Sequence, residues 1–322
     1  MKKHILLAGV LALAAAGFVS CNRQAPGGDD DSSPRIALVC KTLNSPFFLE
    51  MKRGAEAAAD ELGVNLVVQA AERELDVEKQ MQIVENLIQT RVKVLCLTPS
   101  GSRELVPAVA KANKAGIPVI IVDTRLDEDM VKSEGAKALT FIGSDNYDGG
   151  RIVGEYLANS AKEPVKVALL EGIPGHETGD SRLRGFRDAV KDKGNVEIVA
   201  SQTANNERDQ GFNVTQNLLQ AHRDLGAIFA ANDLMALGAV EAVAAAGLTG
   251  KIRIMGFDAV DEARKEIKDG RMEASVAQNP AEMGREAVAS ALRALGGETL
   301  EPYIPVKIEL ITLDKLQDTA TP

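Results

Sequence analysis

The sequence predicts an α/β protein with two doubly wound lobes, each built around an open parallel β-sheet. Short apolar runs alternate with amphipathic, helix-like stretches from residue 35 onward, and this rhythm is interrupted once and then starts again. The runs are apolar throughout instead of alternating with polar residues, as expected for parallel strands that are covered by helices on both faces. A length of 322 residues leaves room for two domains.

The composition is that of a folded soluble protein, with 45% hydrophobic and 26% charged residues. Lys and Arg number 37 against 46 Asp and Glu, which gives a formal net charge of -9, and no basic run exceeds two residues. We therefore expect no nucleic-acid partner. With three Cys and three His, neither a disulfide framework nor a His/Cys metal site is expected.

The N-terminal segment is predicted to direct export. Lys2 and Lys3 precede an apolar run at 5–19, which is shorter than the ~20 residues needed to span a bilayer and is typical of a signal-peptide core. We assign residues 1–20 to a signal peptide. Cleavage elsewhere, near 14–16, and a retained anchor helix are the alternatives.

The start of the mature chain is predicted to carry a lipid. The tetrapeptide FVSC at 18–21 resembles the lipobox of bacterial lipoproteins, and this resemblance implies diacylation of Cys21. Phe18 departs from the pattern, which prefers Leu at this position. Residues 21–34 are therefore predicted to be the lipidated Cys and a flexible linker, because NRQAPGGDDDSSP is too polar to fold.

The first lobe is predicted from five apolar runs and the helices between them. The strands are expected at 36–40, 65–68, 92–97, 117–122 and 138–143, and the helices at 47–62, 77–90 and 103–115. In the second helix, Met81, Val84, Leu87 and Ile88 fall on one face at the helical period. The charged stretch 126–138 is expected to be irregular.

The second lobe repeats the pattern of strand, helix and strand, with right-handed crossovers. Its strands are expected at 165–170, 196–201, 225–230, 251–257 and 273–280, and its helices near 181–193, 208–222 and 233–246. A proline-started helix at 280–296 follows. The run 304–311 is expected to be either a strand pair or one long strand.

The ends of the strands carry the candidate functional residues, because ligands of open α/β sheets bind beyond the carboxyl ends of the strands. The strand-end segments are 41–48, 98–100, 123–125, 171–174, 232–233, 257–258 and 278–280. They contain amides, carboxylates, Arg and Phe. This set suits an uncharged, polyhydroxylated ligand, since carboxylates accept from a hydroxyl, Arg donates to it and amides do both. Phe rings offer apolar surface to the C–H face of a sugar.

Each candidate also has a purely structural explanation. Ser45 followed by Pro46 is a good helix start, and the two phenylalanines after it could belong to the core. Asn232 and Asp258 could cap the helices that follow them. Arg182 could be a surface residue paired with an acid. The convergence of sugar-compatible groups at strand ends in both lobes favours the functional interpretation.

Motifs of catalysis were not found in the sequence. It contains no Walker A motif, no G-x-G-x-x-G after a strand, no G-x-S-x-G and no H-E-x-x-H. The acidic run 127–129 lacks the alternating ligands and turn glycine of a calcium loop. His176 lies in a polar loop and is expected to face solvent. We expect a binding protein that is not an enzyme and that uses no metal and no cofactor.

Six segments of the sequence carry a pattern that can be matched to a family: IALVCKTLNSPFF, AGIPVIIVDT, IGSDNYDGG, NDLMALGAV, GFDA and VAQNP. In this order and spacing, they resemble the periplasmic ribose-type sugar-binding proteins over residues 35–314. The resemblance implies the type I periplasmic binding protein fold, in which two Rossmann-like lobes are joined by a three-crossover hinge. It also implies closure of the lobes on a sugar, which is then handed to an ABC permease.

The resemblance implies a set of seven ligand-binding residues: Phe47, Phe48, Asp123, Arg182, Asn232, Asp258 and Gln278. The two phenylalanines match aromatic residues that sandwich the sugar ring, and the other five match its polar contacts. Further candidates adjoin these positions: Asn44, Ser45, Thr124, Arg125, Asn146, Asn206 and Phe257.

Three positions depart from the ribose-type pattern. Ser45 replaces a second Asn, and Thr124 replaces an Arg, although Arg125 is the next residue. Asn206 stands where a third aromatic residue is expected. The loss of one ring wall and one Arg argues against assuming ribose, and leaves another pentose, a hexose, a polyol or a linear ligand.

The resemblance also implies a division of the chain, with Ser144 at the first crossover. The N-terminal lobe would comprise 35–143 and 279–307, the C-terminal lobe 144–278 and 308–314, and the tail 315–322.

The predicted function is that of the substrate-binding lipoprotein of a sugar ABC importer. The alternative is a sensory protein that presents a sugar or furanose-like signal to a chemoreceptor or histidine kinase. A repressor of the same fold would need an N-terminal helix-turn-helix, whereas this chain starts with an export signal. We expect an exported monomer, periplasmic or at the cell surface, anchored to the membrane by lipid alone. Its partners would be a monosaccharide or polyol and an ABC permease in the inner membrane.

Overall fold

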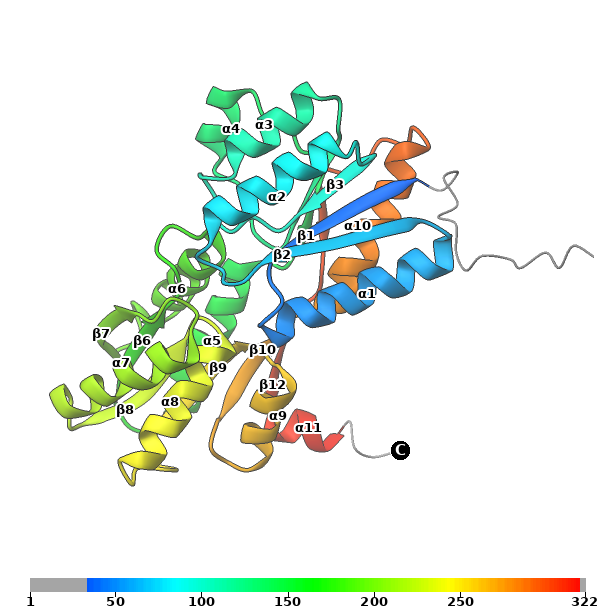
Figure 1. The fold of residues 1–322 in the computed structure, drawn as a ribbon. Helices are drawn as coiled ribbons and strands as arrows, with labels where there is room; N and C mark the ends of the chain where they lie inside the picture. The colour runs from blue at the N-terminus through cyan, green and yellow to red at the C-terminus, as the bar shows by residue number, and fades with distance from the viewer. Residues whose placement is uncertain (1–33, 319–322) are drawn as a thin grey trace, which may run out of the picture. The chain divides into compact units, whose positions relative to one another are not determined.

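The computed structural model describes residues 34–318, so the predicted signal peptide, Cys21, linker residues up to 33, and residues 319–322 lie outside the described residues. The described part contains two six-stranded sheets with helices packed around them (Figure 1). We call sheet A with its helices lobe one, and sheet B with its helices lobe two. No helix within this part of the chain is long and apolar enough to cross a membrane.

Sheet A has the strand order β11-β5-β4-β3-β1-β2, and its strands run parallel. These strands are β1 (Arg35–Thr42), β2 (Asn65–Ala71), β3 (Val94–Leu97), β4 (Val119–Val122), β5 (Phe141–Gly143) and β11 (Tyr303–Pro305). The helices of lobe one are α1 (Pro46–Leu62), α2 (Val77–Gln89), α3 (Val106–Lys114), α4 (Glu128–Glu134) and α10 (Pro280–Leu295).

Sheet B has the strand order β12-β10-β9-β8-β6-β7 and is parallel except for β12, which pairs antiparallel with β10. Its strands are β6 (Val165–Glu171), β7 (Val196–Thr203), β8 (Leu225–Ala230), β9 (Arg253–Asp258), β10 (Ala274–Ala277) and β12 (Glu309–Thr312). The helices of lobe two are α5 (Asn146–Ser160), α6 (Glu177–Val190), α7 (Arg208–Ala221), α8 (Asp233–Ala245), α9 (Asp261–Lys268) and α11 (Leu313–Asp318).

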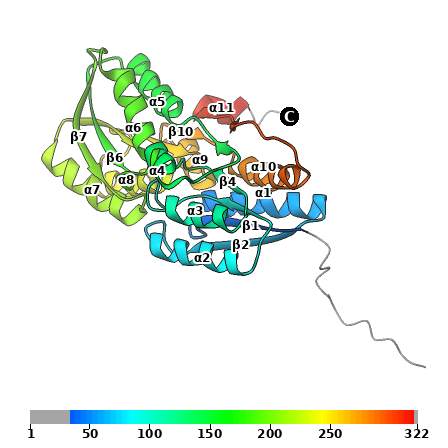
Figure 2. The same ribbon diagram turned by 90° about the horizontal axis from the view of Figure 1, so that it is seen from above.

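The strands of sheet A are apolar throughout because both of their faces are covered. On β1, Ile36 and Leu38 belong to the core cluster formed with α1 and α10, whereas Ala37 and Val39 belong to the cluster formed with α2 and α3. Figure 2 shows these two helix pairs on opposite sides of the sheet. Alternating residues of one strand therefore enter two different cores.

The helices that follow β1 and β10 begin at strong local signals. Ser45 precedes α1 with Pro46 in the first turn, and the helix ends at Gly63, whose φ of 66° is left-handed. Asn279 precedes α10, and its side-chain oxygen accepts a hydrogen bond from the Glu282 amide. The predicted helix start at Pro280 is confirmed. Both helices consequently begin at the carboxyl end of a strand.

Glycines let two helix pairs approach until their backbones touch. A Cβ atom at Gly54 on α1 would lie 1.8 Å from the Ala281 carbonyl oxygen of α10. A Cβ atom at Gly150 on α5 would lie 1.8 Å from the Arg182 carbonyl oxygen of α6. The second contact matters for the site described below, because it places the helix that carries Arg182.

The two predicted parallel-sheet lobes are confirmed, and the chain passes between the sheets three times: from β5 to α5, from β10 to α10 and from β11 to β12. The run 304–311 differs from one long strand, since it contributes β11 to sheet A and β12 to sheet B. The stretch 126–138, expected to be irregular, contains α4, and the helix expected near 181–193 begins at Glu177.

Candidate ligand-binding site

The carboxyl ends of strands from both sheets, with the loops that follow them, surround a small cavity of about 30 Å³. The lining residues are Lys41, Ser45, Phe47, Phe48, Glu74 and Asp123 from lobe one and Thr178, Arg182, Asn206, Asn232 and Asp258 from lobe two. The structure thus brings together six of the seven residues that the family pattern singled out, and the exception is Gln278.

The aromatic surface of the cavity comes from lobe one alone. Phe47 and Phe48 pack edge to face, with ring centroids 5.2 Å apart and planes at 89°. Both rings are buried and belong to the core cluster of α1 and α10. Phe47 and Phe48 therefore belong to the core and also line the cavity.

A buried lysine lies between two carboxylates on the lobe-one wall. The Lys41 ammonium is 3.8 Å from Glu74 Oε2 and 3.8 Å from Asp123 Oδ2, and the residue is 2% exposed. It lies 5.8 Å from the centroid of the Phe48 ring, within range of a cation–π contact. Within residues 34–318 the Lys41 ammonium donates no hydrogen bond, so its N–H groups are available to a ligand oxygen.

Asp123 is held in an uncommon backbone conformation at the end of β4. Its φ of 65° lies in the left-handed region, which is unfavourable for residues other than glycine and is concentrated at functional sites. The Thr124 hydroxyl donates to Asp123 Oδ2 at 2.9 Å. Thr124 is fully buried, so it orients the carboxylate without lining the cavity.

Arg182 is buried at the lobe-two wall, so the interpretation as a surface arginine is wrong. Its Nε donates to Asn146 Oδ1 at 2.8 Å and its Nη1 donates to the Ala231 carbonyl at 2.7 Å. The guanidinium carbon lies 3.8 Å from the centroid of the Phe257 ring. Nη1 is also 3.8 Å from Asp258 Oδ1. Asn146 and Phe257 therefore hold Arg182 and do not line the cavity.

Asp258 lines the cavity from lobe two, and its Oδ1 accepts a hydrogen bond from Gln278 Nε2 at 2.8 Å. Burial raises the pKa of Asp258 to about 7, against the opposing effects of Arg182 and the Gln278 hydrogen bond. The carboxylates of Asp123 and Glu74 raise this pKa further. A ligand hydroxyl that donates to Asp258 would favour its charged form.

A buried network holds the loop that carries Asp258. The φ angles of Asp258 and Ala259 are 111° and 47°. The Ser275 hydroxyl accepts from the Ala259 amide at 3.0 Å and donates to Asp233 Oδ1 at 2.7 Å, and Asp233 Oδ2 accepts from the Val260 amide at 2.9 Å. Burial, and then the charge of Asp258, raise the pKa of Asp233. Asp258 is not a helix cap, because the residue that precedes α9 is Val260.

Two asparagines complete the lobe-two wall. Asn232 caps α8, since its Oδ1 accepts from the Met235 amide at 3.0 Å, and its Nδ2 donates to the Asn206 carbonyl at 3.3 Å. Asn232 is therefore both a cap and a cavity residue. Asn206 extends across the cavity, and its Nδ2 donates to Glu74 Oε2 at 3.1 Å.

Like Thr124, Asn146 and Phe257, two more of the further candidates lie outside the cavity lining. Arg125 is held over two rings, 3.8 Å from the centroid of Phe141 and 4.7 Å from that of Tyr303, and it lines a different surface pocket. Asn44 donates to the Glu72 carbonyl at 2.7 Å and lines an adjoining pocket. Neither side chain is brought to the cavity.

Gln278 lies next to the cavity instead of lining it. Its side chain belongs to a groove that shares Phe47 and Asp258 with the cavity. The buried Oε1 of Gln278 has no hydrogen-bond partner within the described residues. It acts on the cavity through its hydrogen bond to Asp258.

Three residues that line the cavity, Lys41, Glu74 and Thr178, were not among the predicted site residues. Lys41 is the first residue of a strand-end segment, but a lysine that continues a strand usually reaches solvent. Glu74 lies in the charged stretch ERELD, which carries no signal of burial, and Thr178 opens a helix. His176 was expected to face solvent, and this is wrong, because it is 5% exposed. Burial, and then the charge of Lys41, lower the pKa of His176 to about 3.

The lining can bind a neutral ligand that both donates and accepts hydrogen bonds. It holds two cations, three carboxylates, two amides and two hydroxyls around one aromatic surface. Within residues 34–318, no group of three or more His, Cys, Asp or Glu side chains is placed to hold a metal ion.

The chain has relatives among known proteins. Residues 36–299 match the family described as periplasmic binding protein domain. The chain is 39% identical over 311 residues to the ribose import binding protein RbsB of Escherichia coli K12, which covers 97% of this chain and 98% of that protein. It is 37% identical over 313 residues to the D-ribose/D-allose-binding protein of Pseudomonas aeruginosa PAO1, with 95% and 97% covered.

A solved structure shows the same fold. The ABC transporter periplasmic solute-binding protein of Actinobacillus succinogenes 130z with bound D-allose superimposes with a TM-score of 0.85 at 38% identity, covering 89% of this chain and 100% of that one.

The two lobes and the cavity between their strand ends define a solute-binding protein of the type I periplasmic binding protein fold. The chain belongs to the periplasmic binding protein family, and the expected resemblance to its ribose-type sugar-binding members is confirmed. These relatives bind substrates and are not enzymes, as was predicted for this chain.

Proposed function

We propose that the protein is the substrate-binding lipoprotein of a sugar ABC importer. It captures a monosaccharide or polyol in the cavity by closure of the two lobes and delivers it to a membrane permease. The observation that carries this proposal is the cavity itself, in which Asp123 of lobe one and Arg182 and Asp258 of lobe two face one space.

The ligand class follows from the chemistry of the walls. Phe47 and Phe48 offer an apolar surface on one side, whereas the remaining lining is polar or charged. Relatives and structural neighbours are named for ribose and D-allose, and others hold D-fucose, D-arabinose or myo-inositol. These ligands are uncharged and polyhydroxylated, which supports the same class for this chain.

Ligand capture would work by a population shift. A sugar that touches both walls binds the closed form better than the open one and shifts the equilibrium towards closure. Hydrogen bonds to charged groups contribute about 1.5–3 kcal/mol each, and a micromolar Kd requires about 8 kcal/mol. A few such contacts with the charged residues and one ring contact are therefore sufficient.

The lipid anchor and the membrane partner are supported by the sequence and the relatives. Cys21 follows the apolar run 5–19 in a lipobox-like tetrapeptide. The relatives named as import binding proteins support transport over sensing. Cys21→Ser is expected to move the protein from the membrane fraction to the soluble exported fraction, and retention in the membrane would contradict diacylation at this residue.

Binding is tested by a thermal-shift and calorimetry panel of D-ribose, D-allose, D-arabinose, D-fucose and myo-inositol. A sugar at a hundredfold its Kd adds about 2.7 kcal/mol to the free energy of unfolding. Asp123→Ala and Asp258→Ala are expected to abolish this gain and to remain folded, since the buried Asp258 carboxylate is itself unfavourable. Asp224→Ala, at an exposed carboxylate paired with Lys166, is the control. Sugar-dependent stabilisation that persists in both cavity variants would rule out this site.

A further inference from the structure

A side-chain hydrogen bond crosses the cavity from lobe two to lobe one. Asn206 follows β7 and Glu74 follows β2, and Asn206 Nδ2 donates to Glu74 Oε2 at 3.1 Å. Both residues line the cavity, so the bond lies at the wall of the ligand space itself. Opening of the lobes would have to break it.

The lobe-two half of this contact is rigidly placed. Asn206 has a left-handed φ of 61°, and Asn205 before it has a φ of 50°. The Asn206 carbonyl accepts a hydrogen bond from Asn232 Nδ2 at 3.3 Å. Gly172 leaves space for the side chain, because a Cβ atom there would lie 2.6 Å from Asn206 Oδ1. Asn206 is thus held in place before it meets lobe one.

The lobe-one half is anchored in the same way. Glu74 belongs to the loop between β2 and α2, and the Glu72 carbonyl in this loop accepts from Thr42 Oγ1 and from Asn44 Nδ2, each at 2.7 Å. The Lys41 ammonium lies 3.8 Å from the same Glu74 oxygen that Asn206 reaches. The Glu74 side chain is 12% exposed. A cation and an amide donor therefore meet on one largely buried carboxylate oxygen.

A second contact between the same two loops provides a comparison. Arg73 Nε lies 3.8 Å from Glu207 Oε1, but the Arg73 side chain is 57% exposed. Exposed ion pairs of this kind contribute little, because solvent screens them. The hydrogen bond between Asn206 and Glu74 is shorter and better shielded, and one partner carries charge, which strengthens it.

We propose that Glu74 and Asn206 form a latch that holds the two lobes together when the cavity is closed around its ligand. They are positioning residues, which convert ligand binding into closure. This inference rests on the proposed function and adds the pair of side chains through which closure is stabilised. A polar contact thereby occupies the place at which the ribose-type pattern expects an aromatic residue.

The latch and the ligand stabilise the same closed state, so each makes the other more favourable. Loss of the latch is expected to raise the dissociation rate of the sugar more than it lowers the association rate, because association begins from the open form, in which the bond is absent. The stability of the ligand-free protein should change little, since the bond lies between lobes and outside either core.

A double-mutant cycle tests the latch, with D-allose as the probe in calorimetry at one salt concentration. Glu74→Ala and Asn206→Ala are each expected to weaken binding by about tenfold, which matches a charge-assisted hydrogen bond. The double variant should be no weaker than either single one, because the shared bond can be lost only once. Glu74→Gln keeps an acceptor for Asn206 without the charge and should lose less affinity than Glu74→Ala. Arg73→Ala, at the exposed neighbouring pair, should stay within about twofold of the wild type.

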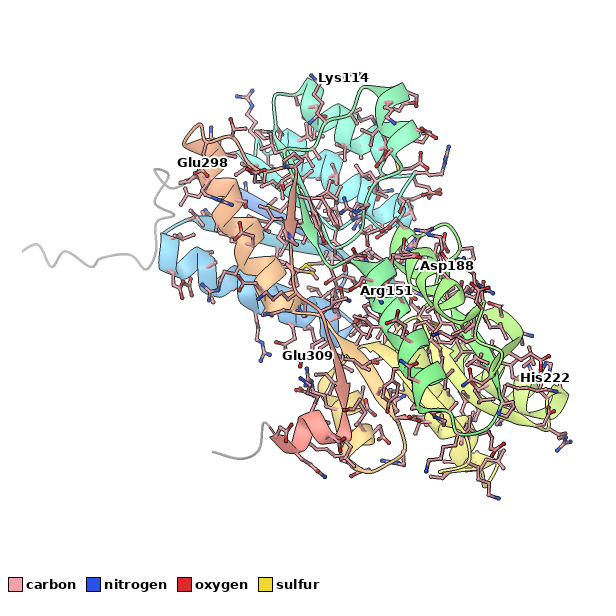
Figure 3. All side chains as sticks on the ribbon, turned by 180° about the vertical axis from the view of Figure 1, so that it is seen from behind. Lys114, Arg151, Asp188, His222, Glu298 and Glu309 are labelled. Carbon is pink, nitrogen blue, oxygen red and sulfur yellow. The ribbon has the colours of Figure 1, made fainter. Side chains whose placement is uncertain are left out.

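Closure is measured directly by fluorescence energy transfer between the lobes. Labels at Lys114→Cys and Arg223→Cys would report on the separation of the lobes, because Lys114 ends α3 of lobe one, whereas His222, the neighbour of Arg223, follows α7 of lobe two (Figure 3). The full chain carries Cys21→Ser, and Cys40 and Cys96 stay unlabelled because burial raises the pKa of each thiol to about 12. The latch predicts that Glu74→Ala and Asn206→Ala lower the closed fraction, with and without D-allose, while the midpoint of thermal unfolding is unchanged.

The outcomes separate the latch from the proposed function. Binding of D-allose with additive effects of the two substitutions would overturn the latch and leave the function standing. If no sugar in the panel binds, the proposed function fails, and the ligand-free closed fraction decides the latch alone. A lower closed fraction in both variants than in the wild type supports the latch. The latch is overturned if the closed fraction is equal in the wild type and the variants, or if none of these proteins closes without ligand.

Discussion

Replacement of Ser275 by Ala is expected to loosen the loop that carries Asp258 without altering any residue that lines the cavity. The Ser275 hydroxyl is buried, accepts from the Ala259 amide at 3.0 Å and donates to Asp233 Oδ1 at 2.7 Å. Asp258 and Ala259 both have positive φ angles, which cost about 1–3 kcal/mol each in residues other than glycine. This strain persists because neighbouring hydrogen bonds hold the loop in place.

The magnitude follows from the two groups that lose a partner. Ser275→Ala leaves the Ala259 N–H unpaired and removes one of the hydrogen bonds to the buried Asp233 carboxyl. A buried polar group that loses its partner costs about 1–3 kcal/mol. We expect the free energy of unfolding to fall by about 3 kcal/mol, or by about 6–12 °C in Tm for a lobe-sized unit. The affinity for D-allose should fall as well, because Asp258 is no longer held towards the cavity.

The assay combines urea unfolding with calorimetric titration of D-allose. Ser290→Ala is the matched control, since Ser290 is also a fully buried serine, but its hydroxyl bonds to Glu286 and Arg293 at the surface of α10. This control should lose less than about 1 kcal/mol and bind normally. A Ser275→Ala protein with the stability and the affinity of the wild type would refute the account of how the loop is held.

Three further predictions concern a buried hydroxyl outside the cavity and the pH dependence of stability. Thr215 has a fully buried hydroxyl without a hydrogen-bond partner within the described residues. Thr215→Val should therefore raise the free energy of unfolding, measured in urea, by about 1 kcal/mol. A decrease would show that the hydroxyl is needed. His176 has a pKa lowered to about 3 by burial, so the unfolded state binds a proton that the folded state does not, and stability should fall as the pH falls from about 6.5 towards 3. His176→Asn should flatten this decline between pH 7 and pH 4.5, and an unchanged slope would contradict it. Asp258 has the opposite effect on stability, because burial raises its pKa to about 7. Its contribution to the free energy of unfolding is present below pH 4 and is lost as the pH rises through 7. Asp258→Asn should remove that loss.

The predictable part of the site consists of residues at strand ends. Asp123 and Asp258 directly follow or end apolar strands, and parallel strands present their carboxyl ends at one edge of a sheet. This local rule was enough to place each carboxylate at the binding edge of its own sheet, whereas the meeting of the two edges at one cavity depends on the tertiary structure. Arg182 could not be placed in this way, because its burial depends on the contact of α5 with α6 at Gly150. Its candidacy therefore depended on the family resemblance.

The sequence by itself determined the alternation of strands and helices, the apolar runs of two doubly covered sheets and the helix starts at Pro46 and Pro280. These features are local, since they depend on periodicity and on the conformational preferences of a few neighbouring residues. Only the tertiary structure decided which sheet receives each half of 303–312. It also decided that the side chains of Lys41, Glu74 and His176 are buried. Strand pairing and the burial of a charged side chain depend on segments distant in the chain, and here on the approach of one lobe to the other, which no short stretch of sequence encodes.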